Sequence, residues 1–271
     1  MKSKRILIFF VSVFALLIVS VLVAASLATS GGSSSATLTK SQTTKSTTQS
    51  HSTFEMVAPE TTVPQDTPVQ QQYDQGFENS FANNMNQFYT AEHINLPSPE
   101  IQGNWPNLSN SNSASTWTTE FIKGLLDINF QSQTRIQLGN WLVAEEAPNL
   151  LPGWPVTLQD KALYTSVLYP GATGQTSPIP SASTWKIDSS QGVSWSVSGL
   201  NVTTDSTWQS MVDAGWQPRD VRMTTEDVSG VLKITDSTTS SNHYFTLTIV
   251  VGSALWHQGY GTVLIGAWTV A

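Results

Sequence analysis

The sequence predicts an α+β fold, in which helices pack on one face of a curved antiparallel sheet. The first observation is that apolar residues recur at helical spacing in the part of the domain that ends near residue 150. The second is that the apolar period changes to two from Lys161 onward, as is typical of strands. Helices followed by a run of strands are typical of the α+β class, because each apolar face needs a covering layer. We therefore expect one ordered domain over residues 73–271.

One unbroken run of apolar and small side chains, residues 6–28, precedes this domain. A helix of that length reaches roughly 35 Å, whereas a hydrocarbon core is about 30 Å thick. Three cations, Lys2, Lys4 and Arg5, stand before the run, and the next cation is Lys40. Positive charge tends to stay in the cytoplasm. Residues 1–28 are therefore expected to be a single-pass anchor in the cell membrane, with the N-terminus cytoplasmic and the C-terminal domain outside.

The same segment also has features of a secretory signal peptide, because small residues, Ser26-Leu27-Ala28, follow its apolar core. Signal peptides usually have a core of about 7–15 residues, and this run is longer, which favours the uncleaved anchor. Both alternatives place the chain from Thr29 onward outside the membrane. Cleavage would make the protein secreted.

Residues 29–72 are rich in Ser, Thr, Pro and Gln and poor in apolar side chains. Such a segment cannot bury enough surface to offset the entropy of ordering it. We interpret it as a disordered stalk that becomes stiffer where the prolines gather. Its simplest role is that of a spacer between the membrane and the domain.

Three helices are expected in the first half of the domain. Ordered structure should start near Tyr73, and aromatic and methionine side chains at helical spacing predict a first helix over residues 77–88. An apolar stripe predicts a second helix over residues 117–128, with Ser115 or Thr116 as its N-cap. A third is expected around residues 136–142.

Strand patterns fill the second half. A short helix interrupts them at residues 205–215, with Asp205 as its N-cap. We interpret Glu226-Asp227 as a turn between two strands, and residues 257–260 as the turn of the last hairpin. The expected strands are residues 162–169, 193–202, 219–225, 229–235, 244–256 and 261–270.

Composition excludes several classes of function. The chain has no cysteine, which excludes thiol catalysis and cysteine-based metal sites. From Phe54 onward, seven cations stand against all 19 acids, a formal charge of −12. Nucleic-acid binding requires a basic surface that displaces counterions from phosphates. We therefore expect no direct contact with nucleic acid, and an anionic membrane surface would repel the domain.

Carboxylates are the first candidates for catalysis. Glu145 and Glu146 are adjacent at the predicted end of a helix, and paired carboxylates can do acid–base work. Neighbours on a helix point about 100° apart, so the favoured interpretation is a solvated helix end. Asp127 follows two leucines and is expected to face solvent or to cap a break, with a cavity acid as the alternative. No catalytic residue is assigned, and an enzyme is not expected.

No metal or cofactor site is expected either. The chain contains no Gly-x-Ser-x-Gly elbow and no glycine-rich phosphate loop after a strand. Its histidines have no second histidine or acid at metal-ligand spacing. The four are His51, His93, His243 and His257.

Ten tryptophans are the most distinctive side chains of the chain. Their usual place is the core, because the indole buries a large apolar area. Two of them, Trp154 and Trp216, fall in predicted loops, and an exposed tryptophan can anchor a protein partner. They are the candidate partner-binding residues, with burial in the core as the alternative.

Three segments together resemble a family of envelope proteins. They are residues 118–155, residues 207–232 and the closing β segment of a chain with one N-terminal anchor. They are similar to the TcpC-like extracytoplasmic components of conjugation systems, which resemble a periplasmic core subunit of type IV secretion. The resemblance implies a nuclear-transport-factor-2-like fold, with helices cradled by a strongly bent antiparallel sheet. TcpC-like proteins often carry two such domains, whereas one is counted in this chain.

The function that this resemblance implies is that of a non-enzymatic assembly component of a conjugation or type IV secretion-like complex. Its partners would be other envelope or secretion subunits, and the chain could form oligomers. Two alternatives stay open. One is a small-ligand-binding protein or cavity enzyme of the same fold. The other is a surface adhesion module, for which the stalk is the only argument.

Overall fold

The computed structural model describes most of the C-terminal domain. The predicted anchor and nearly all of the helix expected at residues 77–88 lie outside the described residues. Every described residue belongs to one compact unit, Thr62–Ala271. None of the helices in this part of the chain is both long and apolar enough to cross a bilayer. The described residues are 66–78, 97–99, 103–154, 156, 159–169, 176–256 and 258–271.

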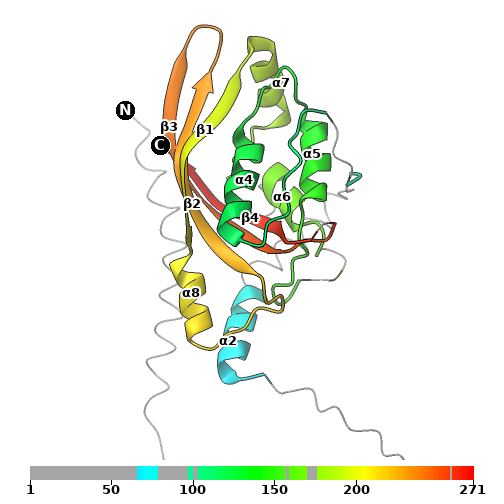
Figure 1. The fold of residues 1–271 in the computed structure, drawn as a ribbon, viewed down its shortest axis with the longest axis vertical. Helices are drawn as coiled ribbons and strands as arrows, with labels where there is room; N and C mark the ends of the chain where they lie inside the picture. The colour runs from blue at the N-terminus through cyan, green and yellow to red at the C-terminus, as the bar shows by residue number, and fades with distance from the viewer. Residues whose placement is uncertain are drawn as a thin grey trace, which may run out of the picture. The chain divides into compact units, whose positions relative to one another are not determined.

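The domain is built on a four-stranded antiparallel sheet in the order β1-β2-β3-β4, so each strand pairs with its neighbour in sequence (Figure 1). This confirms the predicted α+β class with an antiparallel sheet. The strands bend around the helices, and the register shifts at bulges in the β1–β2 and β3–β4 pairings. Their bounds are Ser194–Thr204 for β1, Thr224–Thr235 for β2, Ser240–Ser253 for β3 and Tyr260–Val270 for β4.

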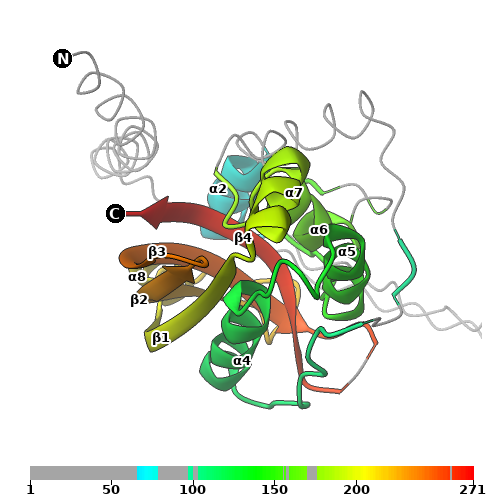
Figure 2. The same ribbon diagram turned by 90° about the horizontal axis from the view of Figure 1, so that it is seen from above.

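Four helices gather on one side of this sheet, as the view from above shows (Figure 2). Helix α4 contacts all four strands, α6 packs on β4, and α5 packs on α6. The predicted helices at residues 117–128 and 136–142 correspond to α4 and α5. Helix α7 was not expected from the sequence. The bounds are Ala114–Leu126 for α4, Arg135–Ala144 for α5, Ala162–Leu168 for α6 and Ala182–Gln191 for α7.

Polar caps set where these helices begin. Ser113 is the N-cap of α4, because its side chain accepts a hydrogen bond from the Thr116 amide at 3.4 Å. The predicted caps, Ser115 and Thr116, lie inside the helix instead. Thr134 and Gln137 form a reciprocal capping box at the start of α5. These side chains satisfy amides that the first turn leaves without partners.

The main core lies between the sheet and these helices. On β3, Phe245, Leu247, Ile249 and Val251 are buried because alternate residues of a strand face the same side. Aromatic rings fill the helical layer, and Trp141 stacks on Phe121 with 5.1 Å between ring centroids.

A second buried cluster includes residues from the opposite face of the sheet. Val250 pairs with Leu264 across β3 and β4, and both side chains are buried there with Trp208 and Trp216. Trp208 belongs to α8, Ser206–Asp213, which follows β1 and has the predicted N-cap Asp205. The expectation that helices line one face alone therefore holds for α4 to α7 but not for α8.

Helix α2, Pro68–Phe77, packs its partly buried Val69, Tyr73 and Phe77 against this second cluster. It begins with Thr67 as N-cap and Pro68 at the first helical position, where proline loses no hydrogen bond. The helix thus starts within the range that was expected to be stalk.

Short segments cover part of both sheet edges. At β1, Ile128 and Trp195 exchange two backbone hydrogen bonds, at 3.1 and 2.7 Å. At β4, Thr262 donates to the Glu145 carbonyl at 2.9 Å and accepts from the Ala147 amide at 2.8 Å. Covered edges offer fewer unpaired groups to other chains.

The expected strand at residues 162–169 is wrong, because this segment forms α6. Leu163 and Val167 lie four residues apart on one helical face and are both fully buried in the main core. Nearly the whole helix is buried. An apolar run that is buried on most sides carries no clear period, so strand and helix could not be separated from sequence.

The predicted turn at Glu226-Asp227 is also wrong, since both residues lie inside the continuous strand β2. Glu226 pairs with Ile249 and Asp227 with Thr248 on β3. The segment before β2 is a loop, not a strand, because the Asp220 side chain accepts hydrogen bonds from the Arg222 amide at 2.9 Å and from the Ser253 amide at 2.6 Å.

Candidate functional site

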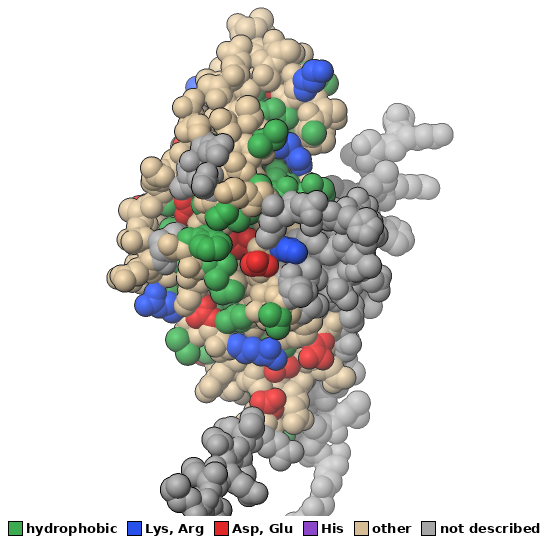
Figure 3. All heavy atoms as spheres, turned by 90° about the vertical axis from the view of Figure 1, so that its right-hand side faces the viewer, with side chains coloured by type: hydrophobic (Ala, Val, Ile, Leu, Met, Phe, Trp, Pro, Cys, Tyr) green, Lys and Arg blue, Asp and Glu red, His purple; other side chains and the backbone are tan. Residues whose placement is uncertain are grey.

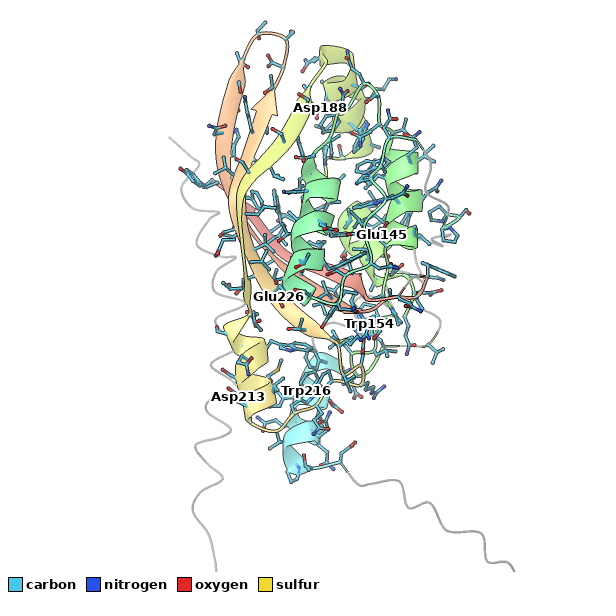
Figure 4. The ribbon with its side chains drawn as sticks, viewed as in Figure 1. Glu145, Trp154, Asp188, Asp213, Trp216 and Glu226 are labelled. Atoms are coloured by element: carbon cyan, nitrogen blue, oxygen red, sulfur yellow. The ribbon has the colours of Figure 1, made fainter. Side chains whose placement is uncertain are left out.

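Both predicted partner anchors, Trp154 and Trp216, are buried (Figure 4). Their exposed fractions are 5% and 1%. Trp216 packs edge-on against Trp208 with 5.1 Å between ring centroids, and its indole N–H donates to Asp74 Oδ1 at 2.9 Å. The expectation of exposed anchors is therefore wrong, because both side chains complete the second cluster.

Glu145 and Glu146 are buried as well, with 3% and 1% exposed, so the predicted solvated helix end is wrong. Glu145 ends α5, and the chain then pairs with Thr262 at the edge of β4. This pairing holds the two adjacent acids against the sheet instead of releasing them to solvent. The sequence contains no signal of it, since the two segments are far apart in the chain.

Glu146 has a structural role at the start of α6. Its Oε1 accepts a hydrogen bond from the Leu163 amide at 3.0 Å, while the N-cap residue, Lys161, makes no side-chain cap bond. Burial raises the pKa of Glu146 well above its usual range, although the Leu163 hydrogen bond opposes this. Oε2 has no hydrogen-bond partner in the described part of the chain. Glu146 thus caps α6 from outside the helix.

Glu145 faces a pocket of about 360 Å³ at the surface. Burial raises the pKa of Glu145 from 4.5 to about 8, and a backbone hydrogen bond from Leu108 opposes the rise. Its carboxyl group is therefore largely protonated at pH 7, and it can donate as well as accept a hydrogen bond. The pocket is lined in part by Asn107, Leu108, Asn110, Ala144, Glu145 and Trp256.

Trp256 is the exposed aromatic wall of this pocket. It lies in the connection between β3 and β4, and 59% of its side chain is exposed. Its indole N–H donates to the Val143 carbonyl at 2.8 Å, which fixes the orientation of the ring. Sequence reasoning counted Trp256 among the core tryptophans. Its position beside a predicted hairpin turn was the signal that it would be exposed.

A second hollow, of about 340 Å³, lies on the outer face of the sheet. Burial and the nearby charge of Asp205 raise the pKa of Asp227, which lines this hollow. The other lining groups are mostly hydroxyls and amides. They include Asn201, Thr203, Ser229, Thr246 and Thr248.

The remaining candidates are Asp127 and the histidines, and the structure assigns a role only to Asp127. Asp127 is the C-cap of α4 and accepts a hydrogen bond from the Val197 amide at 2.6 Å, as expected for a residue that caps a break. Nε2 of His243 lies 2.9 Å from Ser241 Oγ. The other three histidines lie outside the described residues. Within the described ranges, no group of three acids or histidines is placed to hold a metal ion.

The face that lies on the right in Figure 1 is seen directly in Figure 3. Hydrophobic side chains gather across its middle, with acidic and basic side chains scattered between them.

Comparison with known proteins gives no relative: no family model, curated protein or solved structure matches this chain.

Proposed function

We propose that this chain is a membrane-anchored, non-enzymatic assembly component of an envelope complex, of the conjugation or type IV secretion-like kind. Its domain would be a nuclear-transport-factor-2-like fold that docks with other envelope or secretion subunits. The α+β architecture with a bent antiparallel sheet is compatible with that fold. The main support for this proposal is the polar character of the outer face of the sheet.

This outer face is suited to contacts with another protein. Alternate residues of the strands present small polar groups there, and the Thr246 and Thr269 hydroxyls bridge two strands at 2.6 Å. Tyr244 projects from the same face of β3, with 72% of its side chain exposed. Tyrosine combines a large apolar ring with a polar tip, which makes it frequent at protein interfaces.

Tethering makes modest affinity sufficient. The apolar run at residues 6–28 would hold the domain at the membrane, and the polar segment that follows would give it reach. Partners anchored in the same membrane would then meet the domain at high effective concentration. Repulsion between the acidic domain and anionic lipids would keep the domain projecting from the surface.

The carboxylates favour a non-enzymatic role. Glu145 faces the pocket, whereas Glu146 is held by the Leu163 amide, so the two do not act on one point. General acid–base catalysis needs groups within hydrogen-bond reach of the same substrate. Their arrangement supports structure and binding more than chemistry.

Deleting residues 1–28 tests the proposal. The truncated chain, which lacks residues 1–28, should fold, yet it should not support assembly in cells, because it is no longer tethered to the membrane. The measurement is recovery of the envelope complex from membranes of cells that make either chain, with circular dichroism as the check on folding. Asp127→Ala in the full-length chain is the control and should leave assembly intact. Normal assembly by the folded, truncated chain would contradict the proposal.

A second candidate function is small-ligand binding. The observation that favours it is the pocket beside Glu145, in which an oriented tryptophan meets two asparagines.

A further inference from the structure

The pocket between α5 and the β3–β4 connection combines one flat aromatic wall with several neutral polar groups. Trp256 provides the wall, and Asn107 and Asn110 provide amides that both donate and accept hydrogen bonds. Leu108 and Ala144 add apolar surface. Ligand pockets generally have this composition, in which a few polar groups orient a ligand against apolar walls.

The aromatic wall is fixed before any ligand arrives. The Trp256 indole N–H already donates to the Val143 carbonyl, yet more than half of the side chain stays exposed. A ligand would therefore bind to the ring without having to order it, which lowers the entropic cost of binding. Burying an indole face that is already oriented is also a larger gain than burying a mobile one.

Glu145 completes the polar set at the buried end of the pocket. Glu145 as a whole is 3% exposed, and the Leu108 amide donates a hydrogen bond to its carboxyl group. A protonated carboxyl presents one donor and one acceptor side by side, as a primary amide does. The three polar groups of the pocket wall thus match a ligand rich in hydroxyl or amide groups.

We infer that this pocket binds a neutral saccharide, with a sugar ring stacked on Trp256 and its hydroxyl groups bonded to Asn107, Asn110 and Glu145. The apolar C–H face of a pyranose ring matches one indole face, and the hydroxyls at its edge need the kind of groups that line the pocket. This inference goes beyond the proposed assembly function and does not depend on it.

Other ligand classes fit the pocket less well. A nucleotide or an anionic peptide end would need a cation, and the lining residues that the structure describes include none. A quaternary ammonium ion is usually enclosed by several aromatic rings, and Trp256 is the single aromatic side chain among the described residues of this lining. A volume of about 360 Å³ lies at the lower end of small-ligand pockets and suits one or two sugar rings.

Calorimetric titration of the full-length chain tests the inference. The protein is held in a detergent without a sugar headgroup, and the probes are the neutral trisaccharides triacetylchitotriose, cellotriose and maltotriose. At least one should bind with a Kd between about 10 μM and 1 mM. Trp256→Ala should weaken that binding tenfold or more. Ile187→Ala, which removes an exposed apolar side chain on α7, is the control and should leave the Kd unchanged.

A second variant protects the test against loss of folding. Glu145→Gln keeps a donor and an acceptor at the buried end, so it should retain binding at pH 7. Above pH 8 the native carboxyl ionises and becomes an acceptor only, so the Kd of the native chain should change with pH there, whereas that of Glu145→Gln should not. The inference is overturned if none of the three saccharides binds, if binding survives Trp256→Ala, or if choline or trialanine binds at this pocket more tightly than any of them.

Discussion

At the scale of single residues, burial and position decide what each acid does. Glu145 and Glu146 are neighbours, yet one lines a pocket and the other caps α6 through the Leu163 amide. A helix of seven residues is too short to be stable by itself, so an acceptor from a neighbouring segment contributes to holding its first turn. Neither role follows from the adjacency of the two acids in sequence.

The buried acids should make the protein less stable as pH rises. The pKa of Glu145 is raised to about 8, so the folded chain keeps a proton that the unfolded chain releases above pH 4.5. The stabilising contribution is fully present below pH 4.5 and is lost as pH rises to 8. Urea unfolding should show this fall, and Glu145→Gln should raise the free energy of unfolding at pH 8 by about 1–3 kcal/mol.

The matched control for this pH effect is Asp213→Asn, which changes an exposed carboxyl on α8 (Figure 4). It should leave the dependence of stability on pH unchanged. A native chain whose stability is flat from pH 5 to 8, or a Glu145→Gln variant that keeps the full slope, would contradict the assignment of Glu145 as a buried, protonated acid.

At the scale of elements, the connection between β3 and β4 depends on one glycine. Gly259 has a φ of +104°, and a Cβ at this position would lie 2.4 Å from the Ser111 carbonyl oxygen. The neighbouring Tyr260 amide donates to the same oxygen at 3.0 Å. The connection that positions Trp256 is thus held against the loop before α4.

Gly259→Ala should therefore destabilise the domain by more than backbone strain alone. Gly215 is the matched control, because its φ is +100° but a Cβ there would meet no atom within 4 Å. Gly215→Ala should cost about 1 kcal/mol, and Gly259→Ala should cost at least twice as much. Thermal unfolding of both variants measures the difference. Equal losses would show that the Ser111 contact does not constrain this connection.

The elements that sequence predicts well are those with local signals. Asp205 caps α8, and β3 and β4 are rich in residues that favour strands, because both signals lie within one segment. The misread segments depend on distant partners. Residues 162–168 are helical because they pack on β4. Glu226 stays in a strand because the whole of β2 pairs with β3.

The candidate site was harder to predict than the fold. Its parts come from the loop before α4, the end of α5 and the β3–β4 connection, and no local pattern joins them. The two tryptophans that sequence favoured, Trp154 and Trp216, are buried because a second cluster forms at the far face of the sheet. Trp256 is exposed because it lies in the part of the β3–β4 connection that is at the surface.

At the scale of the whole molecule, the two sides of the sheet differ. One is covered by α4 to α7 and contains the main core, while much of the other presents hydroxyl and amide groups with Tyr244 among them. In the function that we propose, the apolar run at residues 6–28 and the polar segment behind it would hold this domain outside the membrane, within reach of its partners. In the proposed function, the outer face makes the contacts that assemble the complex.

The most direct measurement is the mass of the complex that the full-length chain forms when it is extracted from its native membranes. Light scattering after size-exclusion chromatography should show a native particle well above the 29.4 kDa of one chain, after the detergent is accounted for. Tyr244→Lys, which places a charge on the outer face, should reduce that particle to the single chain, while Trp256→Ala should leave it intact. A native chain that is extracted alone, or a complex that Tyr244→Lys does not change, would contradict the claim.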